Sequence, residues 1–222
     1  METLFVFYDH RLVGRLIKNA DATLNFSYEK NWIQETGSFP LSPRLDLEVD
    51  KVFDNRVTRS FFDNLLPEGK VREHLEKYTG KSLTDDFQFL RQFGVDCAGA
   101  FLISPDEHLA KNKVDQEVDE INIEELVKAY NEHKNLMSYV VENHNGRFSL
   151  AGAQGEIKRH HQVDFCQAQG FLSGEKYEED GGPGLKENFN CIRMLSSSYT
   201  HDAQKYMNWI SFNLLIGNND CH

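Results

Sequence analysis

Two stretches of this sequence carry residues whose types and spacing could support phosphoryl transfer. Asp220 lies in GNNDCH, just beyond a strongly apolar helical pattern. A carboxylate on such a loop suits a base that receives a hydroxyl proton, and kinases use an aspartate in this way. Ser149 opens the run SLAGAQ, whose small residues expose backbone N–H groups that can hold phosphate oxygens. Taken singly, a solvated chain end and an ordinary turn are the simpler explanations of these two patterns.

Other reactive residue types form weaker patterns. His160 and His161 stand beside Lys158 and Arg159 and could contact an anion, but a charged surface loop is the more common setting. The DGGPG stretch at 180–184 predicts only a sharp, mobile turn. The four cysteines are far apart and form no CxxC pair, so we expect buried or incidental thiols and neither a zinc site nor a disulfide framework; they are Cys97, Cys166, Cys191 and Cys221.

Composition restricts the classes of protein to consider. The 222 residues carry a formal net charge of −11, which argues against direct binding to DNA or RNA because phosphate neutralisation requires clustered lysine and arginine. No window approaches the ~20 apolar residues of a membrane span, and the first residues read as strands and not as a secretion signal. We therefore expect a cytoplasmic protein with no membrane contact and no direct nucleic-acid contact.

The N-terminal part reads as a β-meander followed by helices. Apolar runs at 4–8, 11–17 and 23–28 predict antiparallel strands, with Asp9-His10 as a tight turn. Two prolines make 39–48 an extended connection. Helices are expected at 61–66, before Pro67, at 71–78, and from a Thr84 cap to Gly94, and a buried strand is expected at 97–104.

The remaining sequence predicts mostly helices. An acidic connection at 105–121 precedes a helix that begins at the Asn122–Glu125 capping box and ends at Asn145-Gly146. The last helix, 203–216, carries an almost wholly apolar face and is expected to be buried. The fold class is therefore α+β, arranged as two units joined by an acidic hinge.

Seven segments, in order along the chain, resemble the HipA family of bacterial toxin kinases. They are FPLSPRL, FFDNLLPEG, FGVDCAGA, SLAGAQ, HQVDFCQAQG, KYEEDGGPG and WISFNLLIGNNDCH. The resemblance implies a HipA N-terminal subdomain at 1–104, an acidic linker and helix at 105–146, and a partial, mostly α-helical protein-kinase-like core at 147–222. It also implies a serine/threonine kinase toxin of a type II toxin–antitoxin system, with ATP and Mg²⁺ as cofactors.

The same resemblance implies partners and site residues. The partner would be a HipB-like antitoxin, which would bring the acidic toxin to DNA indirectly, and the substrate would be a protein such as glutamyl-tRNA synthetase. Asp220 matches the catalytic aspartate, and Ser149 matches the serine that family members autophosphorylate. Gly152, Ala153 and Gln154 match the nucleotide-binding loop, and no metal ligand is carried over. A phosphate on Ser149 would add about −1.5 to −2 charges beside the nucleotide.

The sequence departs from the family pattern at two places. HQVDFCQ begins at His161, soon after Gln154, where family members first pass through apolar strands that carry an ATP-binding lysine. Lys158 is the lysine near this loop, but it lacks that context. The sequence ends at His222, before the magnesium-binding asparagine and the downstream aspartate of the family. Loss of these groups would remove much of the stabilisation of the transition state.

Three hypotheses remain open on the sequence. The first is an active kinase toxin with Asp220 as base and Ser149 as regulatory site. The second is a catalytically inactive, truncated HipA relative that acts as an antitoxin-binding module through residues 1–104. The third is a decayed gene product whose apolar helix at 203–216 lacks part of its packing partner. We favour the kinase toxin by descent, and inactivity for these 222 residues as written.

Overall fold

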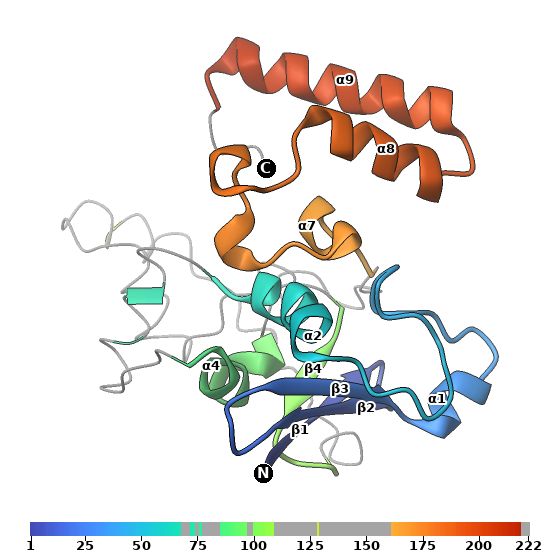
Figure 1. The fold of residues 1–222 in the computed structure, drawn as a ribbon, viewed down its shortest axis with the longest axis vertical. Helices are drawn as coiled ribbons and strands as arrows, with labels where there is room; N and C mark the ends of the chain where they lie inside the picture. The colour runs from blue at the N-terminus through green and yellow to red at the C-terminus, as the bar shows by residue number, and fades with distance from the viewer. Residues whose placement is uncertain are drawn as a thin grey trace.

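A four-stranded antiparallel sheet with strand order β3-β2-β1-β4 organises the N-terminal part of the chain (Figure 1). The computed structural model describes residues 1–67, 72–73, 76, 85–96, 100–108, 128 and 161–218. The strands are β1 (Glu2–Tyr8), β2 (Arg11–Lys18), β3 (Leu24–Tyr28) and β4 (Leu102–Ser104). The predicted meander is confirmed, and β4 closes the sheet on the free side of β1.

The turn between β1 and β2 depends on two residues with positive φ. Asp9 has φ 47° and His10 has φ 65°, and Tyr8 pairs directly with Arg11 across the hairpin. Two successive residues in the left-handed region are typical of a type I′ turn, whose twist matches that of the flanking strands. The tight turn predicted at Asp9-His10 is therefore confirmed.

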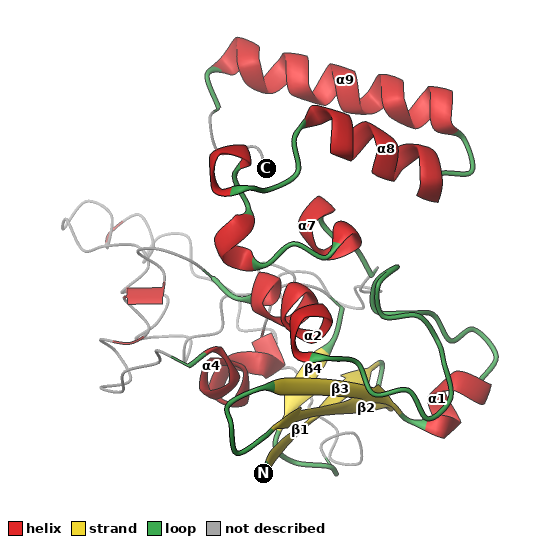
Figure 2. Ribbon diagram, in the orientation of Figure 1, coloured by secondary structure: helices red, strands yellow, loops and turns green. Residues whose placement is uncertain are grey.

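Two helices, each extended by a 3₁₀ turn, pack against the sheet (Figures 1 and 2). They are α2 (Asn55–Phe62) with η1 (Asp63–Leu65), and α4 (Asp86–Phe93) with η2 (Gly94–Asp96); a short α1 (Lys30–Gln34) follows β3. The helix predicted at 61–66 begins earlier, because the Asp54 side chain caps α2 by accepting from the Val57 N–H. Asp85 caps α4 in place of Thr84 by accepting from the Phe87 N–H.

Several predicted elements lie partly or wholly outside the described residues. Of the helix predicted at 71–78, the structure describes three positions, all helical: Arg72, Glu73 and Glu76. The acidic connection at 105–121 is described up to residue 108, and of the helix predicted after it only Lys128 is described. The domain boundaries at 104 and 146 stay a prediction.

Aromatic rings form the centre of the core between the sheet and the helices. The ring of Phe26 lies 4.9 Å from that of Tyr28 and 5.4 Å from that of Phe62, measured between centroids. The Tyr28 hydroxyl accepts from the Leu41 N–H at 2.8 Å and donates to the Leu45 carbonyl at 2.5 Å. This pair of hydrogen bonds ties the irregular 39–48 segment to β3, and burial raises the pKa of Tyr28.

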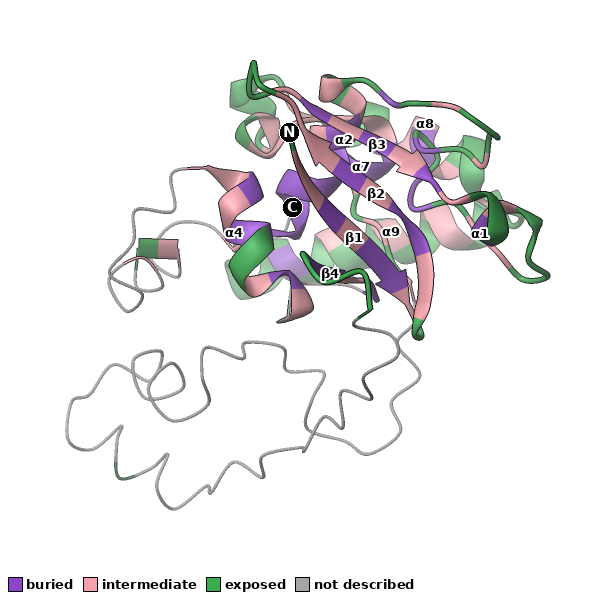
Figure 3. Cartoon of the chain, turned by 90° about the horizontal axis from the view of Figure 1, so that it is seen from below, coloured by how far each residue is buried: buried purple, intermediate pink, exposed green. Residues whose placement is uncertain are grey.

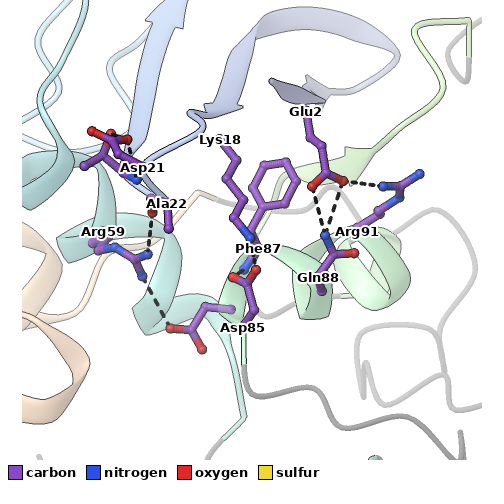
Figure 4. A network of polar contacts seen from close by, with 11 residues as sticks. Glu2, Lys18, Asp21, Ala22, Arg59, Asp85, Phe87, Gln88 and Arg91 are labelled. Carbon is purple, nitrogen blue, oxygen red and sulfur yellow. Dashed lines mark hydrogen bonds and ion pairs between the residues drawn. The ribbon is translucent and has the colours of Figure 1, made fainter.

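Polar contacts fix α4 against the first two strands (Figure 4). Lys18 of β2 forms an ion pair with Asp85, the residue that also caps the helix. The Glu2 carboxylate of β1 accepts from Gln88 at 3.2 Å and from Arg91 at 2.5 Å. Both ends of α4 are therefore held to the sheet.

Helices build the C-terminal part above this unit (Figure 1). They are α7 (Phe165–Gln169), η4 (Ser173–Glu175), η5 (Glu178–Asp180), α8 (Leu185–Leu195) and α9 (Tyr199–Ile216). The last helix is confirmed, but its predicted burial is wrong: Leu214 is 76% exposed and Met207 44% exposed. Figure 3 colours most of α9 as intermediate or exposed. Among the described residues α9 packs along α8, which leaves much of its apolar surface open.

Close packing of β2 against β3 leaves no room for a side chain at Gly14. A Cβ there would lie 2.5 Å from both the Phe26 ring and the Ser27 carbonyl oxygen. We expect Gly14→Ala to lower the free energy of unfolding by about 1–3 kcal/mol, because overpacking displaces core neighbours. Gly174→Ala is the matched control: its Cβ would meet nothing within 4 Å. Urea unfolding measures the free energy of unfolding of both variants. Equal values for Gly14→Ala and Gly174→Ala would contradict the close packing at Gly14.

Candidate functional site

The site residues predicted from the sequence lie outside the described residues. They are Ser149, Gly152, Ala153, Gln154 and Asp220. Their placement therefore stays a prediction. The structure does describe residues close to them in the sequence. These are His161, which follows the predicted phosphate loop, and the Gly217-Asn218 turn, which precedes Asp220.

A fixed turn at the end of α9 directs the chain toward Asp220. Gly217 has φ 67°, and its N–H donates to the Leu214 carbonyl at 3.3 Å, while the Asn218 N–H donates to the Asn213 carbonyl at 2.9 Å. This is the hydrogen-bond pattern of a Schellman motif. The Asn218 amide also donates to the buried Asn213 side chain at 2.7 Å. Backbone and side-chain contacts thus set the exit direction just before Asp220.

His161 anchors the chain on the N-terminal unit. Its ring stacks on Phe39 with 5.2 Å between centroids and meets Phe101 edge-on at 4.8 Å. Nε2 lies 2.7 Å from the Leu41 carbonyl oxygen, and because a carbonyl only accepts, Nε2 carries the proton. Nδ1 is buried and finds no hydrogen-bond partner within the described part of the chain.

The prediction of a charged surface loop is wrong for His161. The ring is half-buried among aromatic side chains, and burial lowers the pKa of His161, which favours the neutral form. His160, Lys158 and Arg159 lie outside the described residues. The sequence gives no sign of this pocket, since Leu41 is 120 positions away along the chain.

Side-chain amides join α7 to the end of α2. The buried Gln167 donates from Nε2 to the Phe61 carbonyl at 3.1 Å, and Asn64 donates from Nδ2 to the Phe171 carbonyl at 3.0 Å. An ion pair between Arg56 and Glu175, 3.0 Å long, lies at the exposed edge. We call this contact the α2–α7 joint. It brings together FFDNLLPEG and HQVDFCQAQG, two of the segments that carry the family resemblance.

A buried carboxyl group lies beside the joint. Asp63 is 7% exposed, and its Oδ2 lies 3.1 Å from Arg59, which also approaches Asp86 at 3.5 Å. Arg72 holds Asp86 at 2.7 Å, and Oδ1 of Asp63 has no hydrogen-bond partner within the described ranges. Burial and the nearby Asp86 charge raise the pKa of Asp63 to about 6, although the two arginines act in the opposite direction.

A cavity of about 240 Å³ opens between α7, the start of α8 and α9. We call it the α7–α9 cavity. The Tyr206 ring forms part of its wall, 5.1 Å from the Phe165 ring and stacked 6.1 Å from the Trp209 ring. Asn188 donates to the Tyr206 hydroxyl oxygen at 2.9 Å and accepts from Gln169 at 2.8 Å. Sequence reasoning missed this cavity, because α7 and α8 were not predicted.

Backbone conformation and close packing explain the glycines of DGGPG. Gly181 has φ 92° and ends η5, and Gly184 precedes α8 as its N-cap. A Cβ on Gly182 would lie 2.1 Å from the Glu175 carbonyl oxygen. The predicted sharp turn is confirmed, and this turn forms the side of the α7–α9 cavity between η5 and α8.

Among the described residues, no group of three His, Cys, Asp or Glu side chains could hold a metal ion. Cys166 and Cys191 are buried free thiols, and burial raises the pKa of Cys191; Cys97 and Cys221 lie outside the described residues. None of the helices that the structure describes is long and apolar enough to cross a membrane.

The raised pKa of Asp63 makes stability depend on pH. The pKa of Asp63 is about 6 in the folded state and 3.8 ordinarily, so the folded protein binds the carboxyl proton more tightly than the unfolded chain does. The stability that this proton contributes is therefore lost as the pH rises from 3.8 to about 6. We expect Asp63→Asn to flatten the pH dependence between about pH 4 and 6 and to raise the free energy of unfolding at neutral pH by roughly 1–3 kcal/mol.

Urea unfolding across this pH range measures the effect on Asp63→Asn. Asp46→Asn is the control, because it removes an exposed aspartate that pairs with Lys51 at the surface. A lower free energy of unfolding at neutral pH with an unchanged slope would show that the Asp63 carboxylate stabilises the fold, against this expectation.

Two family models match the chain: the HipA N-terminal domain at residues 4–104 and the HipA-like C-terminal domain at residues 87–222. A Sinorhizobium fredii protein named "Putative kinase Y4mE" is 25% identical over 307 residues, which cover 100% of this chain and 72% of that protein. The serine/threonine-protein kinase toxin HipA of Shewanella oneidensis is 26% identical over 306 residues, which cover 99% of this chain and 70% of that protein.

A chain in the solved complex of HipA, HipB and operator DNA from Shewanella oneidensis MR-1 has a similar fold. The TM-score is 0.70 at 22% identity, and the match covers 99% of this chain and 71% of that chain. This likeness confirms the predicted α+β fold. Both sequence alignments are longer than the 222 residues of this chain, so these relatives carry residues within the matched region that have no counterpart in it. We predict that they fall between Gln154 and His161.

Proposed function

Because this chain belongs to the HipA family of bacterial toxin kinases, we propose that it is the serine/threonine kinase toxin of a type II toxin–antitoxin system. The observation that carries the proposal is the match of both HipA domains, which together span residues 4–222. The reaction is transfer of the γ-phosphoryl group of ATP to a hydroxyl of a protein, with glutamyl-tRNA synthetase as the candidate substrate. The protein acts in the cytoplasm.

The proposed roles follow the family motifs. Asp220 accepts the proton of the attacking hydroxyl, and Gly152, Ala153 and Gln154 face the phosphates of ATP through their backbone. Ser149 is the regulatory autophosphorylation site, where added negative charge would repel the nucleotide phosphates. Mg²⁺ would neutralise phosphate charge when bound.

The proposed partner is a HipB-like antitoxin. Support comes from the similar Shewanella chain, which was solved together with HipB and operator DNA. A net charge of −11 suits a toxin that reaches DNA through such a partner and makes no direct contact with it. The contact with the antitoxin would lie on residues 1–104, and the acidic segment at 105–146 would link this unit to the kinase core at 147–222.

A second candidate function is that of a catalytically inactive HipA relative that binds the antitoxin. The observation that favours it is the length of the two alignments, since the relatives carry residues within the matched region that this chain lacks. If those residues include the strand with the ATP-binding lysine, phosphoryl transfer would lose a main source of electrostatic stabilisation. The buried core around Phe26 would still support binding through the N-terminal unit.

The two functions predict different masses after incubation of the full chain with ATP and magnesium. For an active kinase we expect one added phosphate that maps to Ser149 and is absent from Ser149→Ala. Asp220→Asn should slow its appearance by about 10²–10⁴-fold, the usual contribution of a general base. Asp46→Asn, a surface change far along the sequence, should leave the rate unaltered. Intact-mass spectrometry and peptide mapping provide the measurement.

An unchanged mass for a chain shown to be folded by circular dichroism would contradict the kinase proposal. The binding module then requires that the same full chain forms a stable complex with a cognate HipB-like protein, measured by size-exclusion chromatography. A folded chain that neither gains phosphate nor forms this complex would contradict both functions.

A further inference from the structure

We propose that the α7–α9 cavity is a docking pocket for an arginine side chain of a protein segment. The proposal concerns binding alone and does not depend on the kinase reaction. It rests on three features of the cavity: its aromatic walls, the sign of the charges at its edge, and its size.

Aromatic rings form the walls of the cavity and also reach its mouth. Phe165, Tyr206 and Trp209 come from α7 and α9, and Tyr177 comes from the connection between η4 and η5. Trp209 is 43% exposed although Tyr206 stacks on it, so part of its ring can be reached by a ligand. A planar guanidinium stacks on such faces and is attracted by their electron density.

Carboxylates dominate the charge around the cavity. Asp164 and Glu178 line it, against one lining cation, Lys176. The exposed Asp180 extends this acidic edge at the end of η5. A cationic side chain that lies against the rings would therefore meet carboxylates that can accept its N–H groups, and arginine offers these donors in a planar fork.

The start of α8 argues against an anionic ligand in the same cavity. Helix N-termini attract anions, and Gly184 lies both at the α8 N-terminus and in the cavity wall. However, a Cβ on Gly184 would lie 2.8 Å from Glu178 Oε1 and 3.1 Å from Glu187 Oε2. Carboxylates of the protein already stand at this helix end, so the position an anion would take is filled.

The size of the cavity suits one side chain. Its volume of about 240 Å³ is below the roughly 300–1,000 Å³ of typical small-molecule sites. The walls are held in advance, because Asn188 fixes Tyr206 and Gly182 packs against the Glu175 carbonyl. A preformed pocket of this size fits a single long side chain presented by a peptide backbone.

Tryptophan fluorescence offers a direct test on the full chain. The protein has two tryptophans, and Trp32 is 1% exposed, so a change on ligand addition reports Trp209. The probes are the acetylated and amidated tripeptides Gly-Arg-Gly and Gly-citrulline-Gly, which differ in charge but hardly in shape. We expect saturable binding of the arginine peptide and at least about fivefold weaker binding of the citrulline peptide.

Matched variants locate the binding. Glu178→Gln should weaken the arginine peptide by about fivefold, while Glu179→Gln, the adjacent exposed glutamate that does not line the cavity, should change it less than twofold. In calorimetry, Trp209→Ala should weaken binding by about fivefold or more, and Phe212→Ala, an exposed residue of α9 outside the cavity, should not. Circular dichroism confirms that each variant is folded.

Three results would overturn the proposal. They are equal affinity for the arginine and citrulline peptides, an equal loss in Glu178→Gln and Glu179→Gln, and no saturable response to millimolar arginine peptide by the folded wild-type chain. The first would indicate an apolar groove without charge selection. The second would indicate diffuse attraction by the acidic surface.

Discussion

The arrangement of the described residues depends on buried carbonyls at the α2–α7 joint. Phe61 belongs to the last turn of α2, where backbone carbonyls have no partner within the helix. Gln167 supplies the missing donor, and Asn64 supplies one to Phe171 in return. Because an amide reaches a carbonyl over only a narrow range of distances, these two bonds fix α7 on the N-terminal unit. α8, α9 and the cavity between them follow from the position of α7.

The segments that carry the family resemblance owe much of their character to packing. Gln167 of HQVDFCQAQG donates to the Phe61 carbonyl of FFDNLLPEG, FPLSPRL supplies the Leu41 carbonyl for His161, and DGGPG packs against the end of η4. Removing one partner of a buried hydrogen bond leaves the other unsatisfied, at about 1–3 kcal/mol each. Such positions accept few substitutions. The motifs therefore reflect the packing of the fold as well as the chemistry of the site.

Local sequence patterns predicted the elements that need only local information. The period-two strands, the Asp9-His10 turn and α4 follow from neighbouring residues, as does the existence of α9. α7 has five residues and little apolar periodicity; its one readable sign is the Asp164–Gln167 capping box. The His161 pocket and the joint connect residues more than a hundred positions apart, so no local pattern could reveal them. For the catalytic residues, the sequence remains the source of the prediction.

The exposed surface of α9 restricts the proposed kinase but not the proposed binding module. A base must be held within a fraction of an ångström of its productive position, and Asp220 follows α9 by one short turn. That turn is fixed to Asn213, but the apolar residues around it, including Leu214 and Leu215, are 76% and 86% exposed. A helix with apolar residues on most of its surface normally lies inside a larger core. A kinase built on this chain must therefore cover α9 before Asp220 can act, whereas an antitoxin-binding module based on the N-terminal unit does not.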